Sequence, residues 1–141
     1  MKSLYLIGSL RNPKVPEIAQ SIRELGFDVF DDWVAAGPTA DDCWRDYERS
    51  RGHSFAQALQ GHAAKQVFYF DHLHLNRCDI VVMLMPAGKS GHLELGYALG
   101  KGKPGFILFD AEPERYDVMY QFSTAVVFSE KDLLEALKKY L

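Results

Sequence analysis

The feature that most constrains this chain is a buried strand that runs almost directly into a glycine-rich helix entry. Residues Ile80–Met85 are apolar without interruption. A short continuous run of this kind predicts a strand that is buried on both faces. A Gly/Ser segment, Gly88–Gly91, follows, and residues 93–99 are expected to form a helix. A strand covered on both faces and followed at once by a helix is typical of a parallel α/β sheet.

The rest of the chain repeats this alternation of strand and helix. Strands are expected at residues 4–7, 27–30, 80–85, 106–109 and 126–128. Helices are expected at residues 17–25, 41–51, 55–76, 93–99 and 130–141. Gly26 and Ser129 are expected to cap helices, at a C-terminus and an N-terminus respectively. The alternation predicts one α/β domain over residues 1–141, with a mostly parallel sheet of about five strands in a three-layer arrangement.

Composition narrows the range of partners. The net charge of -3 argues against a general nucleic-acid binder, which usually carries a basic face. Neither a targeting segment nor a membrane-length apolar run is visible, so we expect a cytoplasmic protein without a membrane partner. Cys43 and Cys78 lie far apart and the histidines lack metal-ligand spacing. We therefore expect neither a disulfide nor a metal site.

Polar residues follow the first expected strand. Gly8 lets backbone approach a ligand closely, and Ser9, Arg11 and Asn12 offer donors to a sugar hydroxyl or a phosphate. The alternative interpretation is a tight turn that carries a surface arginine. A single glycine does not make the dinucleotide-binding fingerprint.

A second group follows the strand at residues 27–30. Asp31 and Asp32 either cap the following turn or reach a base or ribose. Trp33 either stacks on a nucleobase or serves as a partly buried hydrophobic anchor.

A third group lies at the helix entry after residue 85. The backbone N–H groups of Gly88, Ser90 and Gly91 are suited to an anion at a helix N-terminus. His92 is either a ligand contact or a surface residue that helps to cap the helix. Glu94, expected in the first helical turn, either faces a substrate or favours the helix N-terminus by its charge.

Four segments occur in an order that resembles a known family. They are Leu4–Asn12, Phe70-Asp71, Asn76–Val82 and Ser90–Ala98. Together they resemble the nucleoside 2-deoxyribosyltransferase family, including its nucleotide N-glycosidase relatives, from Leu4 to about Phe109. The resemblance implies a single nucleoside 2-deoxyribosyltransferase-like domain with a flavodoxin-like or Rossmann-like fold. Residues 41–61 do not match the family closely.

The resemblance also implies an activity and its residues. Glu94 matches the family nucleophile that attacks the anomeric carbon of a nucleoside, as in retaining glycosidases. Tyr5 matches a tyrosine that hydrogen-bonds this glutamate, and Asp71 an aspartate near the sugar and the leaving base. The implied reaction cleaves the N-glycosidic bond of a nucleoside or its monophosphate and transfers the sugar to another nucleobase or to water, without a cofactor. Gly88 stands where the nucleotide-hydrolysing branch has a serine, so the 5′ group of the substrate stays open.

Family members commonly complete the site with residues of a neighbouring subunit, which implies a homodimer or a dimer of dimers. Residues 116–121 are the candidate segment, in which Met119 and Tyr120 would cover the base; ordinary packing of a loop is the alternative. Two other functions stay open. They are an NAD glycohydrolase-like activity and a nucleotide-sensing module without catalysis.

Overall fold

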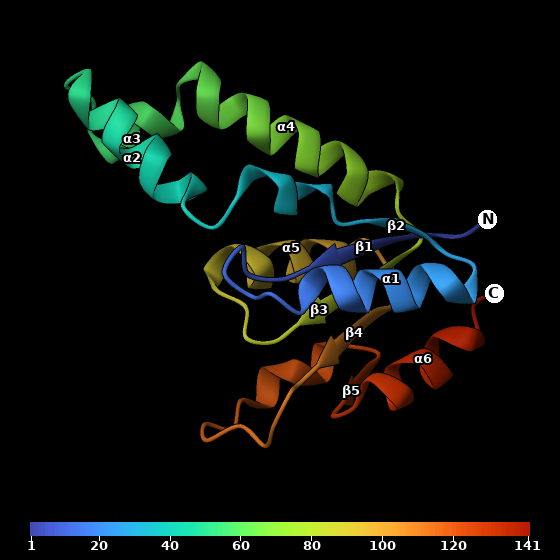
Figure 1. The fold of residues 1–141 in the computed structure, drawn as a ribbon. Coiled ribbons are helices and arrows are strands. Elements are labelled where there is room, and N and C mark those ends of the chain that lie inside the picture. Colours follow the sequence, from blue (N-terminus) through green and yellow to red (C-terminus); the bar gives the residue numbers. More distant parts are fainter.

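The computed structural model describes residues 1–141 as a five-stranded parallel sheet between two layers of helices (Figure 1). The strands are β1 (Ser3–Ile7), β2 (Asp28–Phe30), β3 (Ile80–Leu84), β4 (Gly105–Leu108) and β5 (Ala125–Val127). Their order is β2-β1-β3-β4-β5 and every pair is parallel. This is the doubly wound order of flavodoxin-like proteins. The predicted fold class is confirmed.

Helices cover the two faces of the sheet. The elements are α1 (Val15–Leu25), α2 (Ala40–Ser50), α3 (Phe55–Leu59), α4 (His62–Arg77), α5 (Lys89–Gly100) and α6 (Glu130–Lys138), with 3₁₀ turns η1 (Asp32–Ala36) and η2 (Val118–Phe122). Helices α1 and α6 pack on one face, and α4 and α5 on the other. No helix is both long and apolar enough to cross a membrane.

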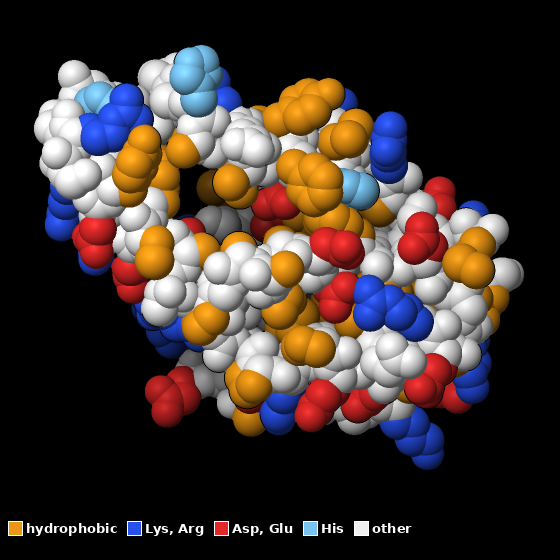
Figure 2. All heavy atoms as spheres, turned by 45° about the horizontal axis from the view of Figure 1, so that its top comes forward, with side chains coloured by type: hydrophobic (Ala, Val, Ile, Leu, Met, Phe, Trp, Pro, Cys, Tyr) orange, Lys and Arg blue, Asp and Glu red, His pale blue; other side chains and the backbone are white.

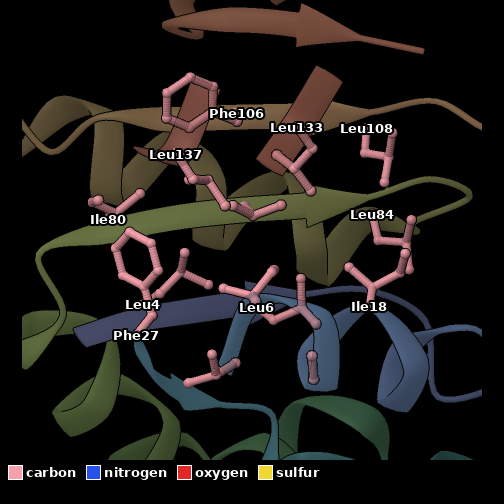
Figure 3. Packing of buried hydrophobic residues seen from close by; sticks show 14 of the residues in the cluster. Leu4, Leu6, Ile18, Phe27, Ile80, Leu84, Phe106, Leu108, Leu133 and Leu137 are labelled. Carbon is pink, nitrogen blue, oxygen red and sulfur yellow. The ribbon is translucent and has the colours of Figure 1, made fainter. Parts of the chain in front are cut away.

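Side chains alternate along β1 and thereby build both cores. Leu4 and Leu6 join the core under α1 and α6, which Figure 3 shows closely packed. Tyr5 and Ile7 point to the opposite face, under α4 and α5. Successive residues of a strand face opposite sides of the sheet. Because Leu4 and Leu6 face the first core, Tyr5 between them faces the second core. That core is where the candidate site lies.

One predicted helix is two. We expected residues 55–76 to be continuous, but α3 ends at Leu59 and α4 begins at His62. Ser54 caps α3 in a reciprocal capping box with Gln57. At Gly61 a Cβ atom would lie 3.1 Å from the carbonyl oxygen of Ala58, so the break brings backbone close to the end of α3.

The helix after β3 begins earlier than predicted. It starts at Lys89, so Ser90, Gly91 and His92 belong to its first turn and Glu94 to its second. The expectation that Glu94 lies in the first turn is therefore wrong, and attraction to the helix N-terminus does not explain its place, since that effect falls off within one turn. The caps at Gly26 and Ser129 are confirmed.

Helices α2, α3 and the first half of α4 project beyond the sheet as an arm, defined as residues 40–70 (Figure 1). The arm carries much exposed apolar surface. Its large exposed hydrophobic residues are Tyr47, Phe55, Leu59, Val67, Phe68, Tyr69 and Phe70. The part of the predicted helix 55–76 that lies in the arm therefore mostly does not pack against the core, because it extends beyond the sheet.

Two glycines provide a matched test of the packing. A Cβ atom on Gly105 would lie 2.7 Å from Leu99 and 3.0 Å from Val81, whereas one on Gly96 would meet nothing within 4 Å. We expect Gly105→Ala to lower the free energy of unfolding by about 1–3 kcal/mol through overpacking. Gly96→Ala, on the open face of α5, should raise it by up to about 1 kcal/mol through helix propensity. Urea unfolding of both variants checks this; equal effects would contradict the packing described.

Candidate active site

The candidate site lies at the carboxyl ends of β1 and β3. The connection from β1 runs to β2 on one side, and the later strands β4 and β5 lie beyond β3 on the other. In doubly wound sheets the crevice at such a reversal is where ligands bind. Tyr5 comes from β1, Asp71 from α4 and Glu94 from α5. The structure brings these three predicted residues to one face of the sheet.

The centre of the site is a short hydrogen bond. The Tyr5 hydroxyl donates to Oε2 of Glu94 over 2.5 Å. Tyr5 is 1% exposed, whereas Glu94 and Asp71 are half-buried. A buried phenol needs a partner, and a carboxylate is a strong acceptor for it. The predicted pairing of Tyr5 with Glu94 is present.

Burial dominates the electrostatics of this pair. Burial raises the pKa of the Glu94 carboxyl to about 7, the hydrogen bond from Tyr5 acts against that rise, and the negative charge of Asp71 adds to it. Burial, followed by the Glu94 charge, raises the pKa of Tyr5, so the phenol stays a donor. Burial also raises the pKa of Asp71, which His74 opposes. Burial therefore makes both carboxyl groups harder to ionise than they are in water.

Two glycines bring β1, β3 and α5 close together. A Cβ atom on Gly91 would lie 3.0 Å from Cγ2 of Ile7, and one on Gly8 would lie 3.1 Å from Val15. Gly91 is buried, so its observed role is close packing of α5 on the sheet. Gly88 precedes α5 without a side-chain cap, and the N–H groups of the first turn, including that of Ser90, start the helix there.

Most of the residues after β2 make contacts that hold the fold together. The indole Nε1 of Trp33 donates to the Leu6 carbonyl over 2.8 Å, and the ring packs against both cores. This contact supports the anchor interpretation of Trp33. Asp31 pairs with Arg23, which also holds the backbone of β2. Asp32 is exposed in η1.

The loop after β1 is shaped by its own polar side chains. Ser9 Oγ accepts from the backbone N–H of Arg11 over 3.1 Å, and Asn12 accepts from that of Lys14 over 3.0 Å. The Arg11 guanidinium reaches the arm and lies 3.5 Å from Asp42. The Ser9 hydroxyl proton and the Asn12 amide N–H groups, the donors predicted for a sugar or a phosphate, are not used in these contacts, whereas Arg11 is paired with Asp42.

His92 and Tyr120 lie together on the other side of α5. Nδ1 of His92 lies 2.8 Å from the Gly88 carbonyl, which only accepts, so this nitrogen carries the proton. Nε2 lies 3.0 Å from the Tyr120 hydroxyl, which therefore donates to it when the ring is neutral. Tyr120 also packs edge-on to Phe109, while Met119 is exposed. The pair fixes η2 against the entry of α5.

Sequence reasoning missed an aromatic wall beside Tyr5. The Phe30 ring lies 4.9 Å from that of Tyr5 and stacks on His74 at 4.0 Å, and Phe70 meets His74 at 4.7 Å. The signals were available: Phe30 ends β2 next to Tyr5 in register, and His74 is one helical turn from Asp71. The wall limits access of water to the acids from the β2 side.

Figure 2 shows a hollow between the arm and the rest of the molecule, with hydrophobic side chains around it and acidic side chains at its edge. No group of three or more His, Cys, Asp or Glu side chains is arranged to hold a metal ion. The hollow opens where the carboxyl ends of the strands meet the arm.

The raised pKa of Glu94 has a consequence for stability. Between pH 4.5 and 7 the folded protein holds a proton on Glu94 that the unfolded chain releases, so this group makes stability fall as the pH rises through that range. Above pH 7 we expect Glu94→Gln to be more stable than the wild type by up to about 3 kcal/mol, the equivalent of the shift. The difference should vanish near pH 4. Denaturant unfolding at several pH values, with the exposed Glu17→Gln as control, checks this; a gain independent of pH would contradict it.

Comparison with known proteins places the fold. No protein-family model matches the chain, and no curated protein matches it in sequence. Two solved structures, however, align with the chain in three dimensions. The CMP N-glycosidase BcmB of Clostridium botulinum aligns with a TM-score of 0.60 at 18% identity, over 96% of this chain and 98% of its own. A 2-deoxyribosyltransferase of the psychrotolerant bacterium Bacillus psychrosaccharolyticus aligns with a TM-score of 0.63 at 18% identity, over 94% and 90%. This chain shares its fold with both enzymes along nearly its whole length.

Proposed function

We propose that this protein cleaves the N-glycosidic bond of a nucleoside or a nucleoside monophosphate through a covalent glycosyl–Glu94 intermediate, and passes the sugar to a second nucleobase or to water. The observation that carries the proposal is the half-buried Glu94 carboxylate, bonded by Tyr5 over 2.5 Å at the sheet reversal. The two enzymes of the same fold, a CMP N-glycosidase and a 2-deoxyribosyltransferase, support it.

The reaction proceeds in two displacements at the anomeric carbon. A Glu94 oxygen forms a bond to C1′ as the bond from C1′ to the base nitrogen breaks, and the base leaves with the electron pair and takes up a proton. The acceptor, a nucleobase nitrogen or water, then bonds to C1′, loses its proton and releases the carboxylate. The transition state of each step carries positive charge on the sugar, which an ionised Glu94 stabilises.

Tyr5 and Asp71 have supporting roles in this scheme. The Tyr5 hydroxyl holds one oxygen of Glu94 and favours its ionised form, leaving the other oxygen for attack. Burial keeps the pKa of Asp71 above its usual range, so it is suited to hold a sugar hydroxyl or to share a proton with the leaving base. The residues predicted around the substrate complete the proposed site. They are Gly8, Ser9, Arg11, Asn12, Asp32, Trp33, Gly88, Ser90, Gly91, His92, Met119 and Tyr120.

A second copy of the chain completes the proposed assembly. Phe68, Tyr69 and Leu93 are 67–75% exposed on α4 and α5, next to the site. Apolar surface of this kind marks an interaction site more often than free surface. Association through this face as a homodimer, or a dimer of dimers, would place Met119 of η2 near a base.

Removal of the nucleophile tests the activity. We expect purified wild-type protein to release free base from at least one deoxynucleoside or deoxynucleotide, and Glu94→Ala to lower that rate at least about a thousandfold. Chromatography of reactions with and without a second free base measures both. A new nucleoside in the presence of the second base identifies transfer, and free base alone identifies hydrolysis.

Other outcomes would replace the proposal. Release of nicotinamide from NAD, with no product from nucleosides or nucleotides, would assign a different glycosidic substrate. Retained nucleoside binding by both wild type and Glu94→Ala, without any product, would assign a sensing role. Unimpaired base release by Glu94→Ala would exclude this residue as the nucleophile.

The pKa of Glu94 also predicts a pH profile. Because attack needs the ionised carboxylate, kcat/KM should rise with pH up to about 7 and then level off. Tyr5→Phe removes the hydrogen bond that lowers the pKa of Glu94, so the rising limb should move to higher pH. Initial rates from pH 5 to 9 measure this, with Tyr47→Phe on the exposed surface of α2 as the control. An unmoved limb in Tyr5→Phe would show that Tyr5 does not act on Glu94 ionisation.

A further inference from the structure

An ion pair joins the loop after β1 to the arm. Nη2 of Arg11, in the loop after β1, lies 3.5 Å from Oδ2 of Asp42, in the first turn of α2. The other oxygen of Asp42 lies 3.3 Å from Nη1 of Arg45, whose Nε donates to Asp46 over 3.0 Å. Two arginines and two aspartates thus form an exposed chain that has no net charge.

Arg11 is one of two basic residues in the loops at the sheet reversal. Residues 8–14 follow β1 and residues 85–88 follow β3; Lys14 directly precedes α1, whereas Arg11 lies in the middle of the first loop and pairs with the arm. These loops are neighbours, because β1 pairs with β3 and Gly91 contacts Ile7. Lys89 follows in the first turn of α5. The acids Glu94 and Asp71 lie on the inner side of the same edge.

We propose that Asp42 is a specificity-determining residue that occupies Arg11 and thereby makes the site select substrates without a 5′-phosphate. The inference rests on the proposed function and adds the substrate class, unphosphorylated nucleosides. A phosphate needs donors in a charge-assisted arrangement, and a guanidinium provides two in parallel. With Asp42 on that guanidinium, a phosphate must displace one carboxylate while it approaches two others. A neutral 5′-hydroxyl meets no such competition.

The Arg11–Asp42 ion pair can be removed by one substitution without disturbing the fold. Its side chains are 72% and 44% exposed, so it contributes little to stability and its loss should leave the fold intact. Asp42→Asn removes the competing charge and keeps the shape of the side chain. Arg11 is then free to bind a phosphate at the loop after β1.

The test compares each deoxynucleoside with its own 5′-monophosphate, so that base preference cancels in the ratio. For the wild type we expect kcat/KM to favour the nucleoside. Asp42→Asn should move the ratio about three- to fivefold toward the monophosphate, because an exposed ion pair competes with the phosphate by at most about that factor. In the double variant Arg11→Met/Asp42→Asn the gain should disappear, which assigns it to Arg11 rather than to the loss of a negative charge.

Two matched controls separate other effects of charge. Asp41→Asn removes a charge from the same first turn of α2, and Asp46→Asn removes one that pairs only with Arg45. Each should change the ratio less than twofold. Circular dichroism of every variant verifies the fold.

The outcomes distinguish this inference from the proposed function. A wild type that already prefers monophosphates, an Asp42→Asn ratio that does not move, or a gain that persists without Arg11 would each overturn the role of Asp42 while leaving base release established. If no substrate is turned over, the proposed function fails, and equilibrium dialysis of the same nucleoside and monophosphate pairs tests the selectivity directly. A gain of about three- to fivefold in monophosphate affinity for Asp42→Asn, dependent on Arg11, would then support it.

Discussion

The hydrogen bond from Tyr5 to Glu94 is the interaction on which the site depends. Strand β1 alternates between two cores, and the residue that faces the α4–α5 side at its centre is a tyrosine with a polar tip. A buried hydroxyl without an acceptor costs about 1–3 kcal/mol, so α5 must present an acceptor at that point. Glu94 does so from the second turn of the helix. The packing of β1, which buries Tyr5, therefore also determines where Glu94 is placed.

The burial of Glu94 has opposite effects on the stability of the folded protein and on the proposed reactivity of the carboxylate. A carboxylate that is removed from water interacts more strongly with a developing positive charge, but it is also harder to ionise. Burial carries the pKa of Glu94 to about 7, and the Tyr5 hydrogen bond restrains the rise. An oxocarbenium-like sugar beside Glu94 would offset part of the cost of ionising this buried carboxylate. Asp71, whose own pKa is raised by burial, carries a negative charge that raises the pKa of Glu94 further.

The sequence was sufficient for features that rest on local pattern and insufficient for those that rest on where the sheet ends. Continuous apolar runs predicted the strands, and Gly26 and Ser129 predicted caps, because each signal involves neighbouring residues only. Periodicity alone made residues 55–76 look like one core-facing helix, yet their stripe extends past the sheet and the chain breaks at Gly61. The roles of Trp33 and Arg11 depended on partners that lie 27 and 31 positions away, at the Leu6 carbonyl and at Asp42. Local sequence patterns could not identify these distant partners.

The sheet and the arm meet two different requirements of the proposed function: fixed distances for the reaction, and changeable contacts for substrate selection. The proposed chemistry at C1′ needs fixed distances; Tyr5 lies in a strand that is buried on both faces, and Glu94 lies in a helix that packs on that strand. Discrimination between substrates needs contacts that can form and break, and the arm meets the β1 loop through an exposed ion pair of small energetic value. On the two proposals made above, a change at Asp42 would act on selectivity without disturbing Glu94, because the arm meets the β1 loop through surface side chains while Tyr5 and Glu94 pack in the core at the centre of the sheet.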